Sequence, residues 1–469
     1  MTESTVAGHA LGLVGLGTMG ANFARNLAGH GTRLVLFDAD AARAATLAGE
    51  LGGGAVAATS LDAALRALPR PRNLFLLVPA GAAVDATLDA LLPSLDAGDA
   101  VIDGGNSFWR DTECRVERLA ARGIAFLGFG VSGGAEGART GPAIMAGGDA
   151  AAVARVAPLF RAVAARHADT PCFVHCGGGG AGHFVKMVHN GIEYAAMQTL
   201  AEAYVLLRDH RGLGAAEIEA VFRGWRDGPC GSFLLDCAVR ALAARENGRP
   251  LIDAIADTAS QKGTGSWAAS AALEFGVPAP TLAEAVFART LSALGAERRA
   301  ASADATGAVS IGTAAAAPDD IVEAILGASI AIHAQGLALI AAAARERGWA
   351  ADLSAIASAW RAGCIIRSSL MERIAAELTA APPPANLTRL PAFARSLAAS
   401  EPGWRRLVAA AATRGTPIPC LASALAYLDG YRQPRSGAHL VAAQRDIFGN
   451  HGFQRLDRPG SFHAVWPSA

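Results

Sequence analysis

The sequence from residue 11 to residue 38 reads LGLVGLGTMGANFARNLAGHGTRLVLFD. It opens with the apolar run Leu11–Val14, which predicts a β-strand, and glycines in G-x-G-x-x-G spacing lead from this strand into a helix pattern. In that context the first glycine permits a tight turn, the second lets the backbone approach a pyrophosphate, and the third lets helix and strand pack closely. The stretch therefore predicts a Rossmann-type dinucleotide-binding unit, whose candidate cofactor contacts are Gly15, Leu16, Gly17, Thr18, Met19 and Gly20.

The second strand pattern, RLVLFD, ends in Asp38, 18 residues after Gly20. A carboxylate at this place can accept hydrogen bonds from both ribose hydroxyls of NAD, and it repels the 2′-phosphate of NADP. Ala39 stands where an arginine would pair with that phosphate, and Arg43 is the one cation nearby. We therefore expect NAD to be the preferred cofactor, with NADP possible.

The rest of the chain divides into three stretches of different pattern. Short β-rich runs alternate with helical runs from residue 10 to about 175, which predicts a parallel sheet with helices on both faces. Four glycines at 177–180 break this pattern, and long helical segments follow them. We expect an α/β Rossmann-like domain at 1–178, a large all-α domain at 179–432 and a polar, Pro/Gly-rich tail at 433–469.

Composition argues against several classes of protein. The 41 basic and 41 acidic residues give a net charge of zero, without the basic stripe of a nucleic-acid binder. Seven cysteines with no C-x-x-C pair are typical of reduced thiols in the cytoplasm, and neither a disulfide framework nor a zinc site is expected. The N-terminus has no signal-peptide pattern. The apolar stretch Ile325–Ala344 is interrupted by His333 and Gln335, so we expect a buried helix and no membrane span.

The segment Gly182–Tyr194, GHFVKMVHNGIEY, carries polar residues on one side of a predicted helix. At 100° per residue, Lys186, Asn190 and Glu193 share one narrow stripe, and Lys186 and Glu193 are two turns apart. A small extended substrate fits between two groups so spaced. A desolvated lysine can act as a base, and a carboxylic acid with a raised pKa can donate a proton. With a nicotinamide nearby, the stripe predicts alcohol oxidation followed by a second proton transfer.

Seven ordered motifs then make the chain, from about Leu11 to Trp466, resemble the decarboxylating 6-phosphogluconate dehydrogenases. They are IDGGNS (102–107), VSGGAEGAR (131–139), GAGHFVKMVHNGIEY (180–194), KGTG (262–265), EAVFAR (284–289), RAGCIIR (361–367) and AQRDIFG (443–449). The resemblance implies a Rossmann domain, a large helical domain, and a tail that inserts into the partner subunit of a homodimer. It also implies conversion of 6-phospho-D-gluconate to D-ribulose 5-phosphate and CO2 with a reduced nicotinamide, without a metal.

Carried over by position, the resemblance implies that Lys186 is the base for the C3 hydroxyl and that Glu193 protonates C1 of the enediol. Asn190 and Asn106 are expected to hold the sugar hydroxyls and the nicotinamide side, and Ser132, Gly133 and Gly134 the substrate carboxylate. The remaining expected substrate contacts are His189, Tyr194, Lys262, Thr264, Arg289 and, from the other subunit, Arg445 and His451. The remaining expected cofactor contacts are Val78, Pro79 and Ala80.

The chain also departs from the family pattern. Members that use NADP usually carry Asn-Arg-Ser/Thr where this chain has Asp38-Ala39-Asp40, and a lysine is common at Pro79; both departures agree with NAD. A glutamate is common at Ala135, so a role for that carboxylate is in doubt here.

Two other functions remain open at this point. One is a non-decarboxylating β-hydroxyacid dehydrogenase, which shares the glycine fingerprint, the Ser-Gly-Gly turn and the lysine. Such enzymes tend to be shorter and to lack the long helical domain. The other is a nucleotide-binding sensor or scaffold with an inactive site, which requires a broken Lys–Asn–Glu stripe, whereas the stripe is intact.

Overall fold

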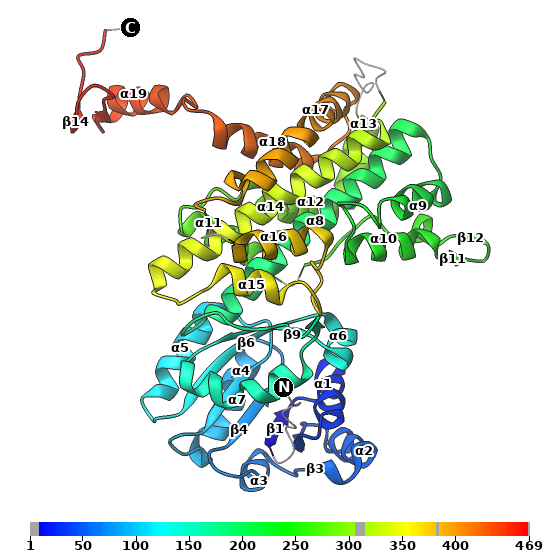
Figure 1. Cartoon of the computed structure of the whole chain (residues 1–469), viewed down its shortest axis with the longest axis vertical. Coiled ribbons are helices and arrows are strands. Elements are labelled where there is room, and N and C mark those ends of the chain that lie inside the picture. The colour runs from blue at the N-terminus through cyan, green and yellow to red at the C-terminus, as the bar shows by residue number, and fades with distance from the viewer. Residues whose placement is uncertain (1–8, 262, 305–314, 381–383, 468–469) are drawn as a thin grey trace.

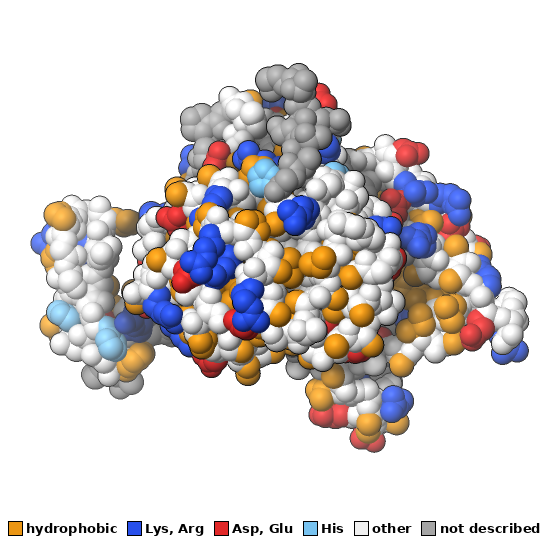
Figure 2. All heavy atoms as spheres, turned by 90° about the horizontal axis from the view of Figure 1, so that it is seen from below, with side chains coloured by type: hydrophobic (Ala, Val, Ile, Leu, Met, Phe, Trp, Pro, Cys, Tyr) orange, Lys and Arg blue, Asp and Glu red, His pale blue; other side chains and the backbone are white. Residues whose placement is uncertain are grey.

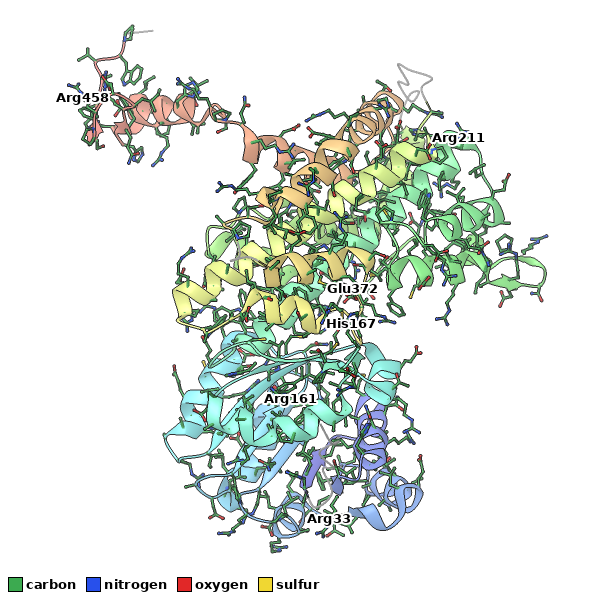
Figure 3. All side chains as sticks on the ribbon, viewed as in Figure 1. Arg33, Arg161, His167, Arg211, Glu372 and Arg458 are labelled. Carbon is green, nitrogen blue, oxygen red and sulfur yellow. The ribbon has the colours of Figure 1, made fainter. Side chains whose placement is uncertain are left out.

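A computed structural model describes residues 9–261, 263–304, 315–380 and 384–467. Figure 1 shows an α/β domain, a larger helical domain stacked on it, and a C-terminal arm that projects from the helical domain. The predicted order of a Rossmann-like unit followed by a large helical domain is confirmed. His167 and Glu372, whose side chains lie 3.1 Å apart, face each other where the two domains meet (Figure 3).

The N-terminal domain is built on one eight-stranded sheet of the described residues, with the strand order β10-β7-β6-β5-β4-β1-β2-β3. The strands are β1 (Ala10–Val14), β2 (Arg33–Phe37), β3 (Ala55–Ala57), β4 (Asn73–Leu76), β5 (Ala100–Asp103), β6 (Ala125–Ser132), β7 (Ala143–Gly147) and β10 (Phe173–His175). The helices are α1 (Thr18–Gly29), α2 (Ala41–Leu51), α3 (Leu61–Arg66), α4 (Ala82–Leu91), α5 (Trp109–Ala120), α6 (Gly134–Thr140) and α7 (Ala150–Val163). Apolar residues of α1, α2 and α7 cover one face of the sheet, and those of α3, α4 and α5 cover the other.

The expectation of a parallel sheet is wrong at one place, because β6 and β7 pair antiparallel. A parallel pair needs a crossover connection of a dozen or more residues. Residues 133–142 hold only the short helix α6, so the chain turns back and β7 runs against β6. The other neighbouring strands of this sheet pair in parallel.

The helical domain packs around two long helices, α8 (Ala181–Arg211) and α14 (Pro318–Arg347). An 18-residue window of α14 has a mean hydropathy of 1.8, but 78% of that window is buried inside the protein, which fits a core helix. The other helices are α9 (Ala215–Gly224), α10 (Phe233–Ala243), α11 (Thr264–Glu274), α12 (Pro280–Ala293), α13 (Gly295–Asp304), α15 (Leu353–Ala359), α16 (Ser369–Ala380), α17 (Pro391–Arg414) and α18 (Pro419–Arg432). Two-residue strands form three small hairpins, β8–β9 (Arg166–His167, Thr170–Pro171), β11–β12 (Arg245–Glu246, Arg249–Pro250) and β13–β14 (Phe453–Gln454, Ser461–Phe462).

The C-terminal arm has more regular structure than its polar sequence predicts. It contains the helix α19 (Ala438–Gly449) and the hairpin β13–β14. The buried carboxylate of Asp446 binds these parts together, since it accepts hydrogen bonds from His463 Nδ1 at 2.7 Å and Trp466 Nε1 at 2.8 Å. Figure 2 shows the arm standing apart from the rest of the chain. Its exposed apolar residues are Leu440, Val441, Ile447, Phe448, Leu456 and Val465.

The first turn of α8 lies directly on the sheet, because glycines remove the side chains that would separate them. A Cβ on Gly182 would lie 2.2 Å from the carbonyl oxygen of Gly128, and a Cβ on Gly130 would lie 2.3 Å from the Cβ of Lys186. Neither distance is possible for a real side chain, so only glycine permits this approach. This close contact between α8 and β6 fixes where the predicted polar stripe of α8 lies relative to the strand ends.

The C-terminal half of α8 also contacts α18 through a buried side chain. The buried carboxylate of Glu202 accepts the backbone N–H groups of Cys420 and Leu421, each at 2.9 Å, and so caps the N-terminus of α18. Burial raises the pKa of Glu202 to about 7, against the opposing effect of these two hydrogen bonds. The cap holds the helix that leads into the arm.

We predict that Glu202→Ala destabilises the protein by about 1–3 kcal/mol, because two buried N–H groups lose their acceptor. Folding raises the pKa of Glu202. Its protonation therefore adds to the free energy of unfolding fully at a pH below the pKa of glutamate in the unfolded chain. This contribution is lost as the pH rises through about 7. The loss caused by Glu202→Ala should therefore be larger at about pH 5.5 than at about pH 8.5. Thermal unfolding followed by circular dichroism measures both effects. The exposed Glu117→Ala is the control, and an equal shift in both variants would contradict the capping role.

Candidate active site

The predicted cofactor residues gather at the carboxyl ends of neighbouring strands. Gly15 follows β1, Asp38 follows β2, Val78 follows β4 and Asn106 follows β5, and these four strands are adjacent in the order β5-β4-β1-β2. Pro79 and Ala80 continue the loop after β4 and are exposed, as is Asn106. This edge is where open α/β sheets bind their ligands.

The glycine turn has the shape that a pyrophosphate requires. Gly15 has a φ of +90°, which favours glycine, and a Cβ on Gly20 would lie 1.9 Å from the Gly15 carbonyl oxygen. At Gly17, by contrast, a Cβ would meet no atom within 4 Å, so this side of the turn is open to a ligand. Helix α1 begins at Thr18 and directs its free N–H groups at the same place. The residues present therefore fit the phosphates of a dinucleotide.

Asp38 is held in its ionised form beside this turn. Its carboxylate accepts the backbone N–H of Leu16 at 2.6 Å and that of Asp40 at 2.9 Å, and Arg43 Nη1 approaches both of its oxygens at 3.3 Å. Burial opposes the ionised state, but the two backbone hydrogen bonds and Arg43 together lower the pKa of Asp38. The side chain remains 10% exposed, and a fixed negative charge at this place suits ribose hydroxyls. Arg43 is itself engaged by Asp38 and by Asp40 at 3.6 Å.

Lys186 lies inside the protein, on the face of α8 that meets β6. The residue is only 6% exposed, and its Cβ occupies the space left by Gly130. Burial lowers the pKa of Lys186, against the attraction of the Glu193 carboxylate. It is also one of only two lysines in the sequence, the other being Lys262, which lies outside the described residues.

Glu193 lies two turns further along the same helix, and its side chain is 20% exposed. Burial raises the pKa of Glu193, against the charges of Lys186 and Arg289. The two shifts have the same cause and opposite signs, because burial disfavours the charged form of each group. Burial therefore shifts both groups toward the forms needed for a base and an acid, a neutral amine and a protonated carboxyl.

A chain of hydrogen bonds crosses the site between these two groups. Ser132 Oγ lies 3.3 Å from His189 Nε2, His189 Nδ1 lies 3.3 Å from Asn190 Oδ1, and Asn190 Nδ2 donates to Thr264 Oγ1 at 3.1 Å. Burial lowers the pKa of His189 well below its usual value, so the ring is neutral. Because an amide oxygen only accepts, Nδ1 carries the proton and Nε2 accepts from Ser132. The chain joins the end of β6 to the start of α11.

The structure brings some of the residues predicted to bind the substrate carboxylate and phosphate to the site, and leaves others away from it. Gly133 and Gly134 follow Ser132 with φ values of +113° and +63°, and the carbonyl oxygen of Gly363 packs against Gly133. The guanidinium carbon of Arg289 lies 3.4 Å from the centre of the Tyr194 ring, which places a cation beside Glu193. Arg445 and His451 are exposed on the arm, which projects away from this site in the same chain (Figure 1).

Several residues around Lys186 were not anticipated from the sequence. Gly128 and Gly130 alternate along β6, and their i, i+2 spacing in a strand is the signal for a close approach on one face. Cys364 lies close enough to Lys186 for the two groups to interact electrostatically, and the Trp360 ring packs edge-on against His189 at 5.4 Å. Both belong to the stretch around the quoted RAGCIIR motif, for which no role was assigned.

Within the described ranges, no group of three or more His, Cys, Asp or Glu side chains is arranged to hold a metal ion. The closely spaced Cys172, His175 and Cys176 are engaged separately. His175 Nε2 lies 3.0 Å from the Gly148 carbonyl oxygen, and burial raises the pKa of both thiols. His175 thus has a backbone partner, and burial favours the neutral thiol of each cysteine, which is not the form that binds a metal.

Comparisons with known proteins match nearly the whole chain. Residues 10–178 match the NAD binding domain of 6-phosphogluconate dehydrogenase, and residues 182–466 match the 6-phosphogluconate dehydrogenase C-terminal domain. Two Bacillus subtilis relatives are the NAD(+)-dependent and NADP(+)-dependent decarboxylating 6-phosphogluconate dehydrogenases. They are 40% and 39% identical, over 98% and 97% of this chain and 99% and 98% of their own lengths.

Among solved structures, Plasmodium falciparum 6-phosphogluconate dehydrogenase superposes with a TM-score of 0.93. Its sequence is 31% identical, and the match covers 97% of this chain and all of that one. Both matched domains, the full-length relatives and the superposition agree, so the chain belongs to the family of decarboxylating 6-phosphogluconate dehydrogenases.

Proposed function

We propose that this protein catalyses the oxidative decarboxylation of 6-phospho-D-gluconate to D-ribulose 5-phosphate and CO2, with NAD preferred over NADP. The observation that carries the proposal is the pair on one face of α8, in which Lys186 is buried and the side chain of Glu193 is 20% exposed. Family membership supports the reaction, and it separates this chain from the non-decarboxylating β-hydroxyacid dehydrogenases.

The first chemical step is oxidation at C3 of the sugar. The nicotinamide cofactor, when bound, accepts a hydride from C3. Neutral Lys186 takes the proton of the C3 hydroxyl as that hydride leaves, so the alcohol becomes a ketone. Burial lowers the pKa of Lys186, which supports this role, because an ordinary surface lysine is protonated at neutral pH.

The second step is loss of CO2 from the resulting β-keto acid. The protonated Lys186 donates a hydrogen bond to the C3 carbonyl and stabilises negative charge there as the C1–C2 bond breaks. The electron pair of that bond becomes the C2–C3 double bond, and the C3 oxygen takes the proton of Lys186, so that an enediol forms. Glu193, whose pKa burial raises, then donates a proton to the former C2, which is C1 of the enediol, while Lys186 takes back the proton of the neighbouring hydroxyl and the ketose product forms.

The groups around this pair have holding roles in the proposal. Ser132, Gly133 and Gly134 bind the carboxylate, while His189, Asn190 and Asn106 hold the hydroxyls and the nicotinamide side. Tyr194, Thr264, Arg289 and Lys262 bind the phosphate; a planar guanidinium pairs with phosphate oxygens through two hydrogen bonds. Arg445 and His451 complete the phosphate site from the other subunit of a homodimer, because the arm of each chain points away from its own site.

The cofactor preference rests on the fixed charge of Asp38. Two backbone N–H groups and Arg43 keep this carboxylate ionised, and the 2′-phosphate of NADP would have to approach it. Arg43 offsets little of the repulsion between Asp38 and that phosphate, because Asp38 and Asp40 already form ion pairs with it. The seven free cysteines, four of them buried, support the cytoplasm as the compartment.

Lys186→Met should abolish turnover and leave cofactor binding intact, since methionine keeps the buried stem and removes the amine. Initial rates on 6-phosphogluconate, release of CO2 and fluorescence titration with NADH measure the three properties. Lys186→Arg distinguishes the base from a simple cation, because arginine keeps the charge and cannot give up its proton. If either variant retained wild-type turnover, Lys186 would not be the base.

Asp38→Asn should raise kcat/KM with NADP and lower it with NAD, so that their ratio changes by about tenfold or more, which corresponds to about 1.4 kcal/mol. Steady-state rates with both cofactors at saturating 6-phosphogluconate give the ratio. Asp89→Asn, at an exposed carboxylate of α4, is the matched control. A ratio that is the same in wild type and Asp38→Asn would overturn the proposed basis of NAD preference.

Mixing two defective variants tests whether the arm acts across subunits. In a mixed dimer of Lys186→Met and Arg445→Ala chains, one site combines an intact Lys186 with an intact partner arm. Random reassortment of equal amounts should therefore restore about a quarter of wild-type activity at low substrate, because half of the dimers are mixed and each has one intact site. If Arg445 served its own chain, mixing would restore nothing.

A further inference from the structure

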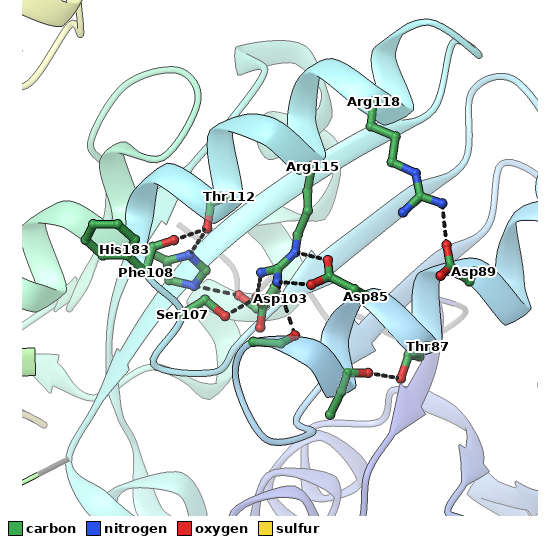
Figure 4. A network of polar contacts seen from close by, with 12 residues as sticks. Asp85, Thr87, Asp89, Asp103, Ser107, Phe108, Thr112, Arg115, Arg118 and His183 are labelled. Carbon is green, nitrogen blue, oxygen red and sulfur yellow. Dashed lines mark hydrogen bonds and ion pairs between the residues drawn. The ribbon is translucent and has the colours of Figure 1, made fainter. Parts of the chain in front are cut away.

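The fully buried carboxylate of Asp103, at the end of β5, controls the loop that carries Asn106. Its Oδ1 accepts the backbone N–H of Gly105 at 2.9 Å. Its Oδ2 accepts the hydroxyl of Ser107 at 2.5 Å (Figure 4). These two bonds enclose Asn106 between fixed neighbours. A single acidic side chain thus sets the path of a loop whose own tip is exposed.

Arg115, buried on α5, ties this loop to the one after β4. Its Nε and Nη2 donate to the two carboxylate oxygens of Asp85 at 2.7 and 2.9 Å, and Nη2 also donates to the Gly81 carbonyl oxygen at 3.2 Å. Nη1 lies 3.8 Å from Asp103 Oδ2 and has no hydrogen-bond partner. Gly81 follows directly on Val78–Ala80, so one guanidinium joins both loops proposed to hold the nicotinamide side.

His183 connects the same loop to the catalytic helix. Its Nε2 lies 3.1 Å from the Asp103 carbonyl oxygen, and its Nδ1 lies 2.7 Å from Thr112 Oγ1 (Figure 4). A carbonyl only accepts, so Nε2 carries the proton of the neutral ring and the Thr112 hydroxyl donates to Nδ1, with the Phe108 carbonyl oxygen at 3.3 Å as a weaker second acceptor at the start of α5. The ring fits because β6 has Gly128 here, whose Cβ would lie 2.8 Å from Nδ1. Lys186 follows one turn later on the same helix.

We propose that Asp103, Arg115 and His183 are positioning residues, which hold the Asn106 loop, the Val78–Ala80 loop and helix α8 at one fixed spacing. This inference rests on the proposed roles of Lys186 and Asn106. None of the three side chains contacts the substrate in the proposal; each acts through the loop or helix that it fixes. The cluster spans α4, β5, α5 and α8, so it crosses from the Rossmann domain into the first helix of the substrate domain.

The reaction makes such a cluster necessary. Hydride transfer requires the sugar carbon, the base and the nicotinamide in one geometry, and a displacement of about 1 Å costs on the order of 10²-fold in rate. Lys186 lies on a helix of one domain, whereas Asn106 lies on a loop of the other. Without a rigid connection, their spacing would vary with every movement of the two domains.

Thr112→Val tests the inference, because valine has the shape of threonine and cannot donate to His183 Nδ1. We expect kcat to fall by about tenfold or more while KM for 6-phosphogluconate changes less than about twofold. With substrate deuterated at C3, the isotope effect on kcat should increase, because a misplaced hydride donor makes hydride transfer more strongly rate-limiting. Thr112→Ser, which keeps the hydroxyl, should restore the wild-type values.

Thr87→Val is the matched control, since the Thr87 hydroxyl bonds only the Ala83 carbonyl within its own helix. Equal kcat and isotope effect in Thr112→Val and wild type would overturn the inference, and so would equal losses in Thr112→Val and Thr112→Ser. If Thr112→Val does not fold, Ser107→Ala, which removes one bond to Asp103, must show the same rise in isotope effect. The proposed function is tested separately. If the wild-type protein turns over 6-phosphogluconate and Lys186→Met does not, the proposed function stands whatever the Thr112 variants show.

Discussion

The close contact between α8 and β6 is the constraint on which the site depends. Gly128, Gly130 and Gly182 remove three side chains, so the helix backbone touches the sheet and Lys186 is sealed between them. Had β6 carried alanines, the helix would stand further off and water would reach the amine. The lysine would then keep its ordinary pKa and stay protonated. Packing between the backbones of α8 and β6 thus lowers the pKa of the proposed base.

The same burial sets the desolvation of Lys186 and Glu193 against their attraction for each other, and a bound substrate would change that balance. Lys186 and Glu193 attract each other as ions, yet both shifts of pKa favour their neutral forms, so desolvation outweighs that attraction. A sugar phosphate lying between them would contact both groups and bring its own hydroxyls as partners. The largely desolvated pair is therefore placed to exchange protons with a ligand, whereas a fully exposed ion pair of the same residues would exchange them with water.

Much of this arrangement could be predicted from local sequence. The 11–38 stretch predicts the glycine turn and Asp38, and helical spacing predicts the stripe of Lys186, Asn190 and Glu193. The antiparallel β7 could not be predicted, since the alternation of strands and helices says nothing of strand direction. Nor could the contacts of Glu202 with α18 or of His183 with Asp103, which join residues 80 or more positions apart. Such pairs become neighbours only through tertiary packing, which the spacing of one segment does not encode.

The scarcity of lysine has a chemical consequence. Of the 41 lysine and arginine residues only Lys186 and Lys262 carry amines, so nearly all the positive charge belongs to guanidinium groups. Guanidinium groups resist acylation, and they keep their charge throughout the pH range in which proteins are handled. Acetylating or succinylating agents remove the positive charge of the surface lysines of most enzymes. They would change the net charge of this protein very little, because it has only two lysines. Amine-directed isotopic tagging would consequently label very few groups besides the N-terminal amine, and its spectrum would have hardly any background.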